Sequence, residues 1–422
     1  MTKGRDGAIQ AIEAHRRGDA SAVVLLERAL ADDPRNSSLL IAHAEAAVMA
    51  GRPDPLRRLE QMVDLSPDWV DGQLALANLL FELGEEDRFA SRFVEALRRN
   101  PANTGLWNAY IQALVGAGLP DQAADVARDA RTHFDVPVLK LIEANHAGAA
   151  GQVERAGKLL AEVPEQLPEY PEVAARHFVR TGEYPRALEL LDLLRARNPA
   201  DLSSWALTEL LWRKTSDPRA EWLSLHPAFV KAIDLGMSAN DIAGLAALLR
   251  SLHTSRGRPL NQSARGGTQT RGELFRRQEP QIQQLRARIQ AALDDYRDQL
   301  PPVDKAHPLL SRRDEQWIVE GGWSIRLQSS GYHVAHIHPS GLVSSACYIV
   351  IPPPGGDPRE GQLEIGRPAE DIPIDLEPIA SFAPQPARLV LFPSFLYHGT
   401  RPFGSGERLS VAFDAHCASR PV

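Results

Sequence analysis

Six glycines recur at a nearly constant interval through the first half of the chain. They are separated by 33, 33, 34, 33 and 31 residues, at Gly18, Gly51, Gly84, Gly118, Gly151 and Gly182. Proline follows four of them after 16 or 17 residues, at Pro34, Pro67, Pro101 and Pro199. A unit of this length holds two helices, with glycine where a turn needs positive φ and proline before the next helix. The period therefore predicts stacked helical pairs, which form a solenoid.

The segments between these glycines are amphipathic at helical spacing, as in the stripe Leu74, Ala77, Leu80 and Phe81. A period near 34 residues is that of the tetratricopeptide repeat (TPR). We therefore predict about six degenerate TPR-like repeats over residues 1–215, with the fourth and fifth irregular because their prolines are displaced. The concave face of such a solenoid often binds peptides, so a peptide or protein is the expected partner of this half.

Residues 216–300 are expected to be a helical linker region with a glycine-rich loop in the middle. From Arg250 to Arg288 the chain has nine Arg and only two acidic residues, whereas the whole protein has a net charge of −7. Such a segment could attract an anionic substrate, but a solvated arginine-rich face is the preferred interpretation. Only Phe275 is interleaved with the arginines, so binding to nucleic acid is not expected.

The pattern changes to period two in residues 301–422. Short β-rich runs separated by glycine and proline predict an all-β domain; they are Trp323–Leu327, Tyr332–His338, Val343–Ile351, Gln362–Ile365, Arg388–Phe392 and Leu409–Phe413. A double-stranded β-helix, or jelly roll, is the architecture of this class that holds metals at its mouth. A turn near Gly404–Gly406 is expected to lay His398 beside Arg408 on neighbouring strands.

Three histidines in this domain have the spacing of a metal site. On a strand, His336 and His338 share one face and His333 points the other way. His398, from a later strand, would complete a three-point facial site with open positions opposite. Arg408, ten residues beyond His398, suits a bidentate carboxylate partner. This array favours iron together with a carboxylate-bearing cosubstrate, although three histidines also suit zinc.

These residues resemble the 2-oxoglutarate/Fe(II) oxygenases, and most closely bacterial members that fuse tetratricopeptide repeats to the catalytic domain. The resemblance covers roughly the last 160 residues and is carried by the stretches Ser263–Thr270, Trp323–Leu327, His336–Ser340, Gly361–Gly366, Pro393–Thr400 and Arg408–Asp414. Prolyl and aspartyl/asparaginyl hydroxylases are more distantly similar. The resemblance also makes Arg265–Thr270 a candidate loop over the active site.

The resemblance implies a 2-oxoglutarate- and Fe(II)-dependent dioxygenase that hydroxylates a peptide or protein side chain. His336, His338 and His398 would hold the metal, and Arg408, Ser410 and Tyr348 the cosubstrate. His338 stands where the broader superfamily has Asp, so the ligand set has one negative charge fewer. Glu364 could supply a carboxylate if it lay near the metal, but a solvated or structural role is the preferred interpretation. Two alternatives stay open: a non-catalytic TPR scaffold with a degenerate jelly roll, and a three-histidine cupin-type dioxygenase that does not use 2-oxoglutarate.

Composition narrows the class of protein further. The chain has 43% hydrophobic and 24% charged residues, as ordinary globular proteins do. It has no apolar run of a membrane span's length and no apolar leader at its start. Its two cysteines, Cys347 and Cys417, build no disulfide framework. A cytoplasmic protein without a membrane partner is the expectation.

Overall fold

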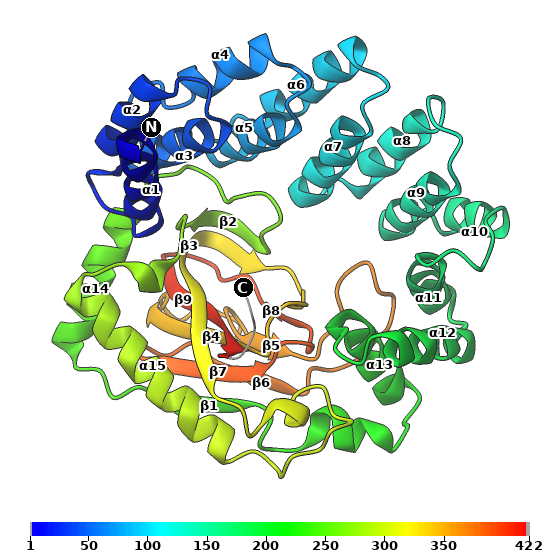
Figure 1. The fold of residues 1–422 in the computed structure, drawn as a ribbon. Helices are drawn as coiled ribbons and strands as arrows, with labels where there is room; N and C mark the ends of the chain where they lie inside the picture. The colour runs from blue at the N-terminus through cyan, green and yellow to red at the C-terminus, as the bar shows by residue number, and fades with distance from the viewer. Residues whose placement is uncertain (1, 419–422) are drawn as a thin grey trace.

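The computed structural model describes residues 2–418 and consists of a helical arc that curves over a β-domain (Figure 1). Paired helices stack one after another through the arc, which confirms the TPR-like solenoid. They are α1 (Thr2–Arg16), α2 (Ala22–Asp32), α3 (Ser37–Met49), α4 (Arg57–Leu65), α5 (Val70–Glu82), α6 (Glu86–Arg99), α7 (Thr104–Ala117), α8 (Pro120–Ala130), α9 (Pro137–Ala149), α10 (Val153–Ala161), α11 (Tyr170–Thr181), α12 (Tyr184–Arg197) and α13 (Leu202–Lys214).

The periodic glycines occupy the turn between the two helices of each pair. All six have φ between +60° and +88°, a region that side chains with a Cβ atom rarely adopt. The glycines therefore recur because each helix pair has a turn that requires positive φ at one residue.

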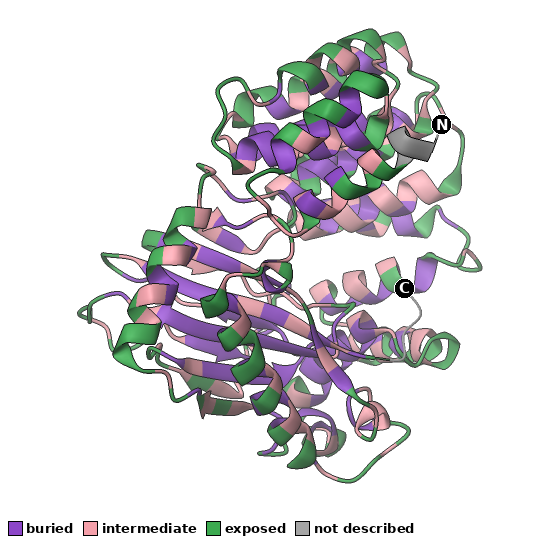
Figure 2. Ribbon diagram, turned by 60° about the vertical axis from the view of Figure 1, so that its left-hand side comes forward, coloured by how far each residue is buried: buried purple, intermediate pink, exposed green. Residues whose placement is uncertain are grey.

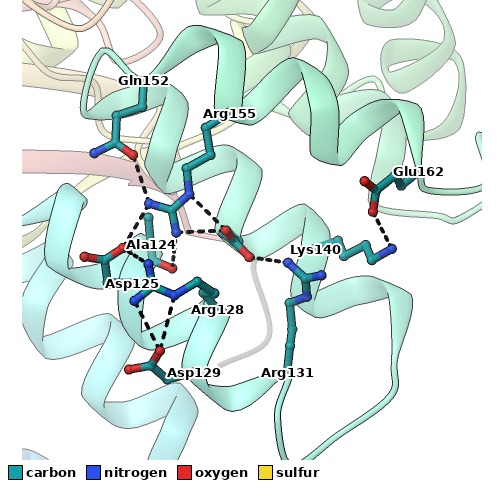
Figure 3. Close-up of polar contacts among 10 residues, drawn as sticks. Ala124, Asp125, Arg128, Asp129, Arg131, Lys140, Gln152, Arg155 and Glu162 are labelled. Carbon is teal, nitrogen blue, oxygen red and sulfur yellow. Dashed lines mark hydrogen bonds and ion pairs between the residues drawn. The ribbon is translucent and has the colours of Figure 1, made fainter.

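A buried ion-pair network crosses the junction of α8, α9 and α10, where the sequence repeat is irregular (Figure 3). The Glu143 carboxylate is only 4% exposed and accepts hydrogen bonds from Arg131 (2.6 Å) and Arg155 (2.9 Å). Arg155 also contacts Asp125 on α8 at 2.9 Å. Because a buried carboxylate is costly without partners, these arginines hold the three helices in one arrangement.

The β-domain contains two antiparallel sheets, as the jelly-roll prediction requires. The six-stranded sheet has the order β1-β7-β4-β9-β3-β2, and the three-stranded sheet the order β6-β5-β8. The strands are β1 (Lys231–Asp234), β2 (Ala264–Gln269), β3 (Trp317–His333), β4 (Val343–Val350), β5 (Leu363–Ile365), β6 (Ala380–Phe382), β7 (Arg388–Pro393), β8 (His398–Thr400) and β9 (Arg408–Cys417).

Two helices, α14 (Ala239–Leu252) and α15 (Pro280–Asp298), cover the outer face of the large sheet. Their apolar stripes, including Leu249 and Ile289, pack on strand residues such as Leu389 and Phe413. Figure 2 shows these strands as buried beneath helices whose outer sides are exposed. The inner face of the large sheet meets the small sheet and forms the cavity described below.

The segment 216–300 contributes strands as well as the expected helices. β1 pairs with β7, and β2 pairs with β3, so this segment supplies both edges of the large sheet. The glycine-rich stretch Arg265–Thr270, expected to be a loop, is therefore mostly strand. Its Gly267 lies so close to the Arg326 and Leu327 backbone that a side chain would clash there. The glycines serve a close backbone approach rather than loop mobility.

The arginine-rich segment keeps five of its nine arginines exposed, as the expected solvated face requires, and it also forms a junction between the two parts of the molecule. Arg271 pairs with Glu82 on α5 and, at 2.8 Å, with Glu45 on α3. Arg258 donates hydrogen bonds to the carbonyls of Gly116 and Ala117 at the end of α7 (3.1 and 3.2 Å). With Arg277, which donates to the Gly18 carbonyl, three of the nine arginines thus contact carboxylates or carbonyls of the solenoid.

The far end of the solenoid also packs on the β-domain. Trp205 and Trp212 of α13 are buried in one apolar cluster with Phe392 of β7. Arg180 of α11 pairs with Asp371 at 2.5 Å. The arc therefore packs against the β-domain at both of its ends. In residues 2–418, no helix has the length and apolarity needed to cross a lipid bilayer.

Candidate metal and cosubstrate site

The three predicted histidines come together at the mouth of the jelly roll. β3 ends at His333, and the chain continues through His336 and His338 without regular strand structure. The backbone of His336 forms two hydrogen bonds with that of His398, of 3.0 and 2.9 Å, which fixes the loop against β8. One nitrogen from each imidazole lies within 4.8 Å of the other two.

The orientation of each imidazole suits metal binding. The Nδ1 atom of His336 lies 2.9 Å from the Val334 carbonyl, and that of His398 lies 3.0 Å from the Leu396 carbonyl. Because a carbonyl only accepts, each Nδ1 carries the proton and each Nε2 keeps its lone pair for a ligand. The Nε2 atoms of His336 and His338 are 3.0 Å apart. Two nitrogens about 2.1 Å from one ion, at a right angle, have about that separation.

Burial keeps the imidazoles of His336 and His398 in the neutral form that metals require. Burial is the main cause that lowers the pKa of His336 to about 3, with the neighbouring His338 as a second cause. Burial likewise lowers the pKa of His398 well below its usual value. Both rings are therefore neutral at pH 7, with a proton on Nδ1 and none on Nε2, as metal ligands must be.

An aspartate that sequence reasoning did not assign to the site lies behind His338. Asp414 of β9 accepts a hydrogen bond from His338 Nδ1 at 2.6 Å, and its same oxygen accepts one from Ser344 at 2.9 Å. The carboxylate thus supplies, one hydrogen bond away, the negative charge that the three-histidine set lacks. A carboxylate behind a ligating histidine is a common way to orient the ring and raise its basicity.

Arg408 is buried without a carboxylate partner among the described residues. Its side chain is 1% exposed and donates to the Gly361 carbonyl (3.2 Å) and the Thr400 hydroxyl (2.8 Å). Beside it, the buried Tyr348 hydroxyl has no hydrogen-bond partner in the part of the chain that is described. Burial raises the pKa of Tyr348 to about 12, so the hydroxyl keeps its proton and can donate. A buried cation and an unused donor together favour an anionic ligand.

One cavity of about 300 Å³ joins the histidines to Arg408. Tyr348 and Ser410 are cross-strand partners of β4 and β9, so both side chains project from the same face into this cavity. The expectation that His398 and Arg408 lie on neighbouring strands is wrong, because β8 belongs to the small sheet and β9 to the large one. The two residues face each other across the cavity instead.

Two further sequence-based assignments are settled by contacts. Glu364 is not among the clustered metal-ligand candidates, and its carboxylate accepts hydrogen bonds from Arg367 (2.6 Å) and Arg401 (2.7 Å). It is a structural ion-pair residue. His333 lines the cavity, although strand alternation predicted that it points away, and its Nδ1 contacts the Ser263 hydroxyl at 3.0 Å. The chain leaves regular strand geometry after His333, so alternation no longer applies there.

Comparison with known proteins identifies the catalytic domain. Residues 321–414, which include the three histidines, Tyr348, Arg408, Ser410 and Asp414, match the model of a family described as "Putative 2OG-Fe(II) oxygenase". This segment is a 2OG-Fe(II) oxygenase domain. Fe(II) and 2-oxoglutarate are the cofactors of that chemistry, and they fit the histidine cluster and the buried Arg408, which has no carboxylate partner among the described residues. No curated protein matches the sequence significantly.

Several solved structures are similar to part of the chain. A prolyl-4-hydroxylase from Pseudomonas putida is 20% identical over 44% of this chain and 92% of its own, with a TM-score of 0.30. HygX from Streptomyces hygroscopicus, solved with nickel and 2-oxoglutarate, is 13% identical over 45% and 84% (TM-score 0.32). A tetratricopeptide repeat protein from Parabacteroides merdae is 15% identical over 53% and 91% (TM-score 0.38).

Asp414 yields a prediction about metal affinity. We expect Asp414→Asn to weaken Fe(II) or Mn(II) binding about 10- to 100-fold, because His338 loses its anionic partner. His338→Asp should retain binding, since it places a carboxylate directly on the ion, and His338→Ala should lose at least as much affinity as Asp414→Asn. Calorimetric titration with Mn(II) measures all three. Unchanged affinity in both His338→Ala and Asp414→Asn would remove His338 from the ligand set.

Proposed function

We propose that this protein is a 2-oxoglutarate/Fe(II)-dependent dioxygenase that hydroxylates a side chain of a peptide or protein recruited by its TPR-like repeats. Fe(II) would be held by His336, His338 and His398. The far carboxylate of 2-oxoglutarate would be held by Arg408, with Ser410 and Tyr348 donating hydrogen bonds. The observation that carries this proposal is one cavity that joins the histidine cluster to a buried guanidinium with no carboxylate partner among the described residues.

The residues of the chain position the reactants and keep water out. When bound, Fe(II) and 2-oxoglutarate supply the oxidation of a substrate C–H bond by dioxygen, with succinate and CO2 as coproducts. The Nδ1 hydrogen bonds hold the three imidazoles in one orientation. Arg408, anchored by Gly361 and Thr400, fixes one end of the cosubstrate at a set depth in the cavity. The Trp323 ring lies 5.9 Å from that of His338 and covers this side of the site.

We also propose the division of labour that the sequence suggested, with residues 1–215 for recruitment, 216–300 as the connecting region and 301–422 for catalysis. The buried junctions at both ends of the arc support a fixed arrangement of the solenoid and the β-domain. Recruitment and catalysis would take place in one rigid arrangement, because the solenoid is packed on the β-domain rather than tethered to it.

Titration of the full-length protein under anaerobic conditions tests the proposed cofactors. We expect one equivalent of Mn(II) to bind, and N-oxalylglycine, an inert 2-oxoglutarate analogue, to bind only after the metal. In air and with added 2-oxoglutarate, the Fe(II)-loaded protein should release succinate slowly even when no peptide substrate is present. A scaffold without iron activity would release no succinate. A dioxygenase independent of 2-oxoglutarate would consume oxygen when no 2-oxoglutarate is present. Either result would overturn the proposal.

A further inference from the structure

One position presents a polar side chain on the first helix of the pair in the second to sixth repeats, whereas the first repeat has Ile12 there. It lies six residues before the periodic glycine and is occupied by Glu45, Asn78, Gln112, Asn145 and Arg176. These residues belong to α3, α5, α7, α9 and α11, so they occupy equivalent places along the arc. Equivalent positions of stacked repeats lie in a row along one face of the solenoid, so these polar side chains share a surface.

The outer members of this row bind the protein's own oxygenase half. Glu45 pairs with Arg271 at 2.8 Å. The Asn78 Oδ1 atom accepts a hydrogen bond of 2.8 Å from the backbone N–H of Leu260. Arg176 forms a hydrogen bond with Tyr397. The row therefore faces the β-domain, and at Asn78 a side-chain amide already binds main chain that crosses the arc.

The two central members of the row have no such contact. Gln112 is exposed and Asn145 is half-buried. Neither side chain has a hydrogen-bond or ion-pair partner among residues 2–418. Each amide offers both a donor and an acceptor, which is the pair of groups that a peptide backbone requires.

The repeats that carry or follow these two amides contact segments that border the catalytic cavity. On one side, Asn261 lines the cavity and its backbone N–H donates to the Gly116 carbonyl of α7 at 3.1 Å. Gly116 is one helical turn beyond Gln112, on the same face of α7. On the other side, Tyr397 contacts Arg176 and directly precedes His398. Figure 1 shows α7 and α9 in the middle of the arc, between its two junctions with the β-domain.

We propose that Gln112 and Asn145 bind the main chain of the substrate peptide as it enters the catalytic cavity. The inference rests on the proposed function and adds the path of the substrate. Uncharged amides bind any peptide backbone, so this contact holds a segment beside the cavity without selecting its sequence. Selection of the modified residue is then left to the cavity itself.

The test uses full-length protein loaded with Mn(II) and N-oxalylglycine, so that substrate binds without turnover. Random 12-residue peptides displayed on phage are selected on this protein, and a selected peptide is synthesised with a fluorescent label. We expect Gln112→Ala/Asn145→Ala to weaken its binding about 10- to 100-fold, the effect of losing two or more hydrogen bonds. The matched control, Gln122→Ala on α8 of the same repeat, removes an exposed amide outside the row and should bind as the wild type does.

The readouts separate this inference from the proposed function. The double variant should bind Mn(II) and N-oxalylglycine with wild-type affinity, and with Fe(II) it should hydroxylate the peptide with raised KM and unchanged kcat. Equal peptide affinity in the wild type and double variant, or no selected peptide at all, overturns the peptide path and leaves the cofactor site standing. Failure of the wild type to bind metal and analogue overturns the proposed function itself.

Discussion

Replacement of His398 by alanine is expected to abolish stoichiometric metal binding and leave the fold intact. His398 is the proposed ligand that comes from the small sheet, and its backbone hydrogen bonds to His336 do not depend on its imidazole. Loss of the ring leaves two nitrogens, both from one short segment. His336→Ala should behave in the same way, because its Nε2 lies 3.0 Å from that of His338.

Calorimetric titration with Mn(II) measures this effect, and circular dichroism reports the fold. We expect affinity to fall by at least 100-fold, since even the loss of a partner behind a ligand typically costs 10- to 100-fold. The matched control is His416→Ala, which removes a half-buried histidine of β9 outside the cluster. Wild-type Mn(II) affinity in either His336→Ala or His398→Ala would mean that the metal site is assigned to the wrong residues.

Replacement of Arg408 by alanine should abolish cosubstrate binding while metal binding is retained. The guanidinium is the buried cation of the cavity and has no carboxylate partner within the described chain. Removal of one partner from a buried charge pair costs about 2–5 kcal/mol, or about 30- to several thousand-fold in affinity. Arg408→Lys should recover only part of this loss, because an ammonium cannot form the bidentate contact of a guanidinium.

Binding of N-oxalylglycine to the Mn(II)-loaded protein measures the effect of the Arg408 variants. Arg359→Ala removes an exposed arginine of the same domain and serves as the control. Arg408→Gln retains most of the side-chain volume, so it separates loss of charge from loss of packing if the alanine variant is less stable. A wild-type affinity in Arg408→Gln would show that the guanidinium does not hold the carboxylate, and Tyr348 and Ser410 would then have to bind it alone.

Features that depend on neighbouring residues in the chain were predictable from the sequence. The interval between Gly18 and Gly182 predicted the solenoid because each turn has its own need for positive φ. The His336–His338 spacing predicted that two imidazoles would meet. Alternation also predicted β4, β5 and β7 to within one residue, as for Val343–Ile351 against β4 (Val343–Val350), whereas the predicted strand Tyr332–His338 is regular only as far as His333.

Features that depend on pairing between distant segments were decided only by the tertiary structure. The contact between His338 and Asp414 joins residues 76 positions apart, and nothing in either local pattern specifies it. The same holds for β1 and β2. These short segments form strands because an existing sheet edge offers their backbones hydrogen bonds.

The placement of His398 and Arg408 shows the same division. The turn between them predicted a hairpin, but β8 pairs with β5 and β9 with β3 and β4. Local turn chemistry sets where the chain reverses, whereas the burial of side chains such as Ile365 and Val411 in separate clusters sets which sheet each strand joins. The sequence by itself pointed to the residues that we propose carry the chemistry, apart from Asp414. The packing of the two sheets determined that they face one cavity, with Asp414 behind one ligand and Arg408 opposite.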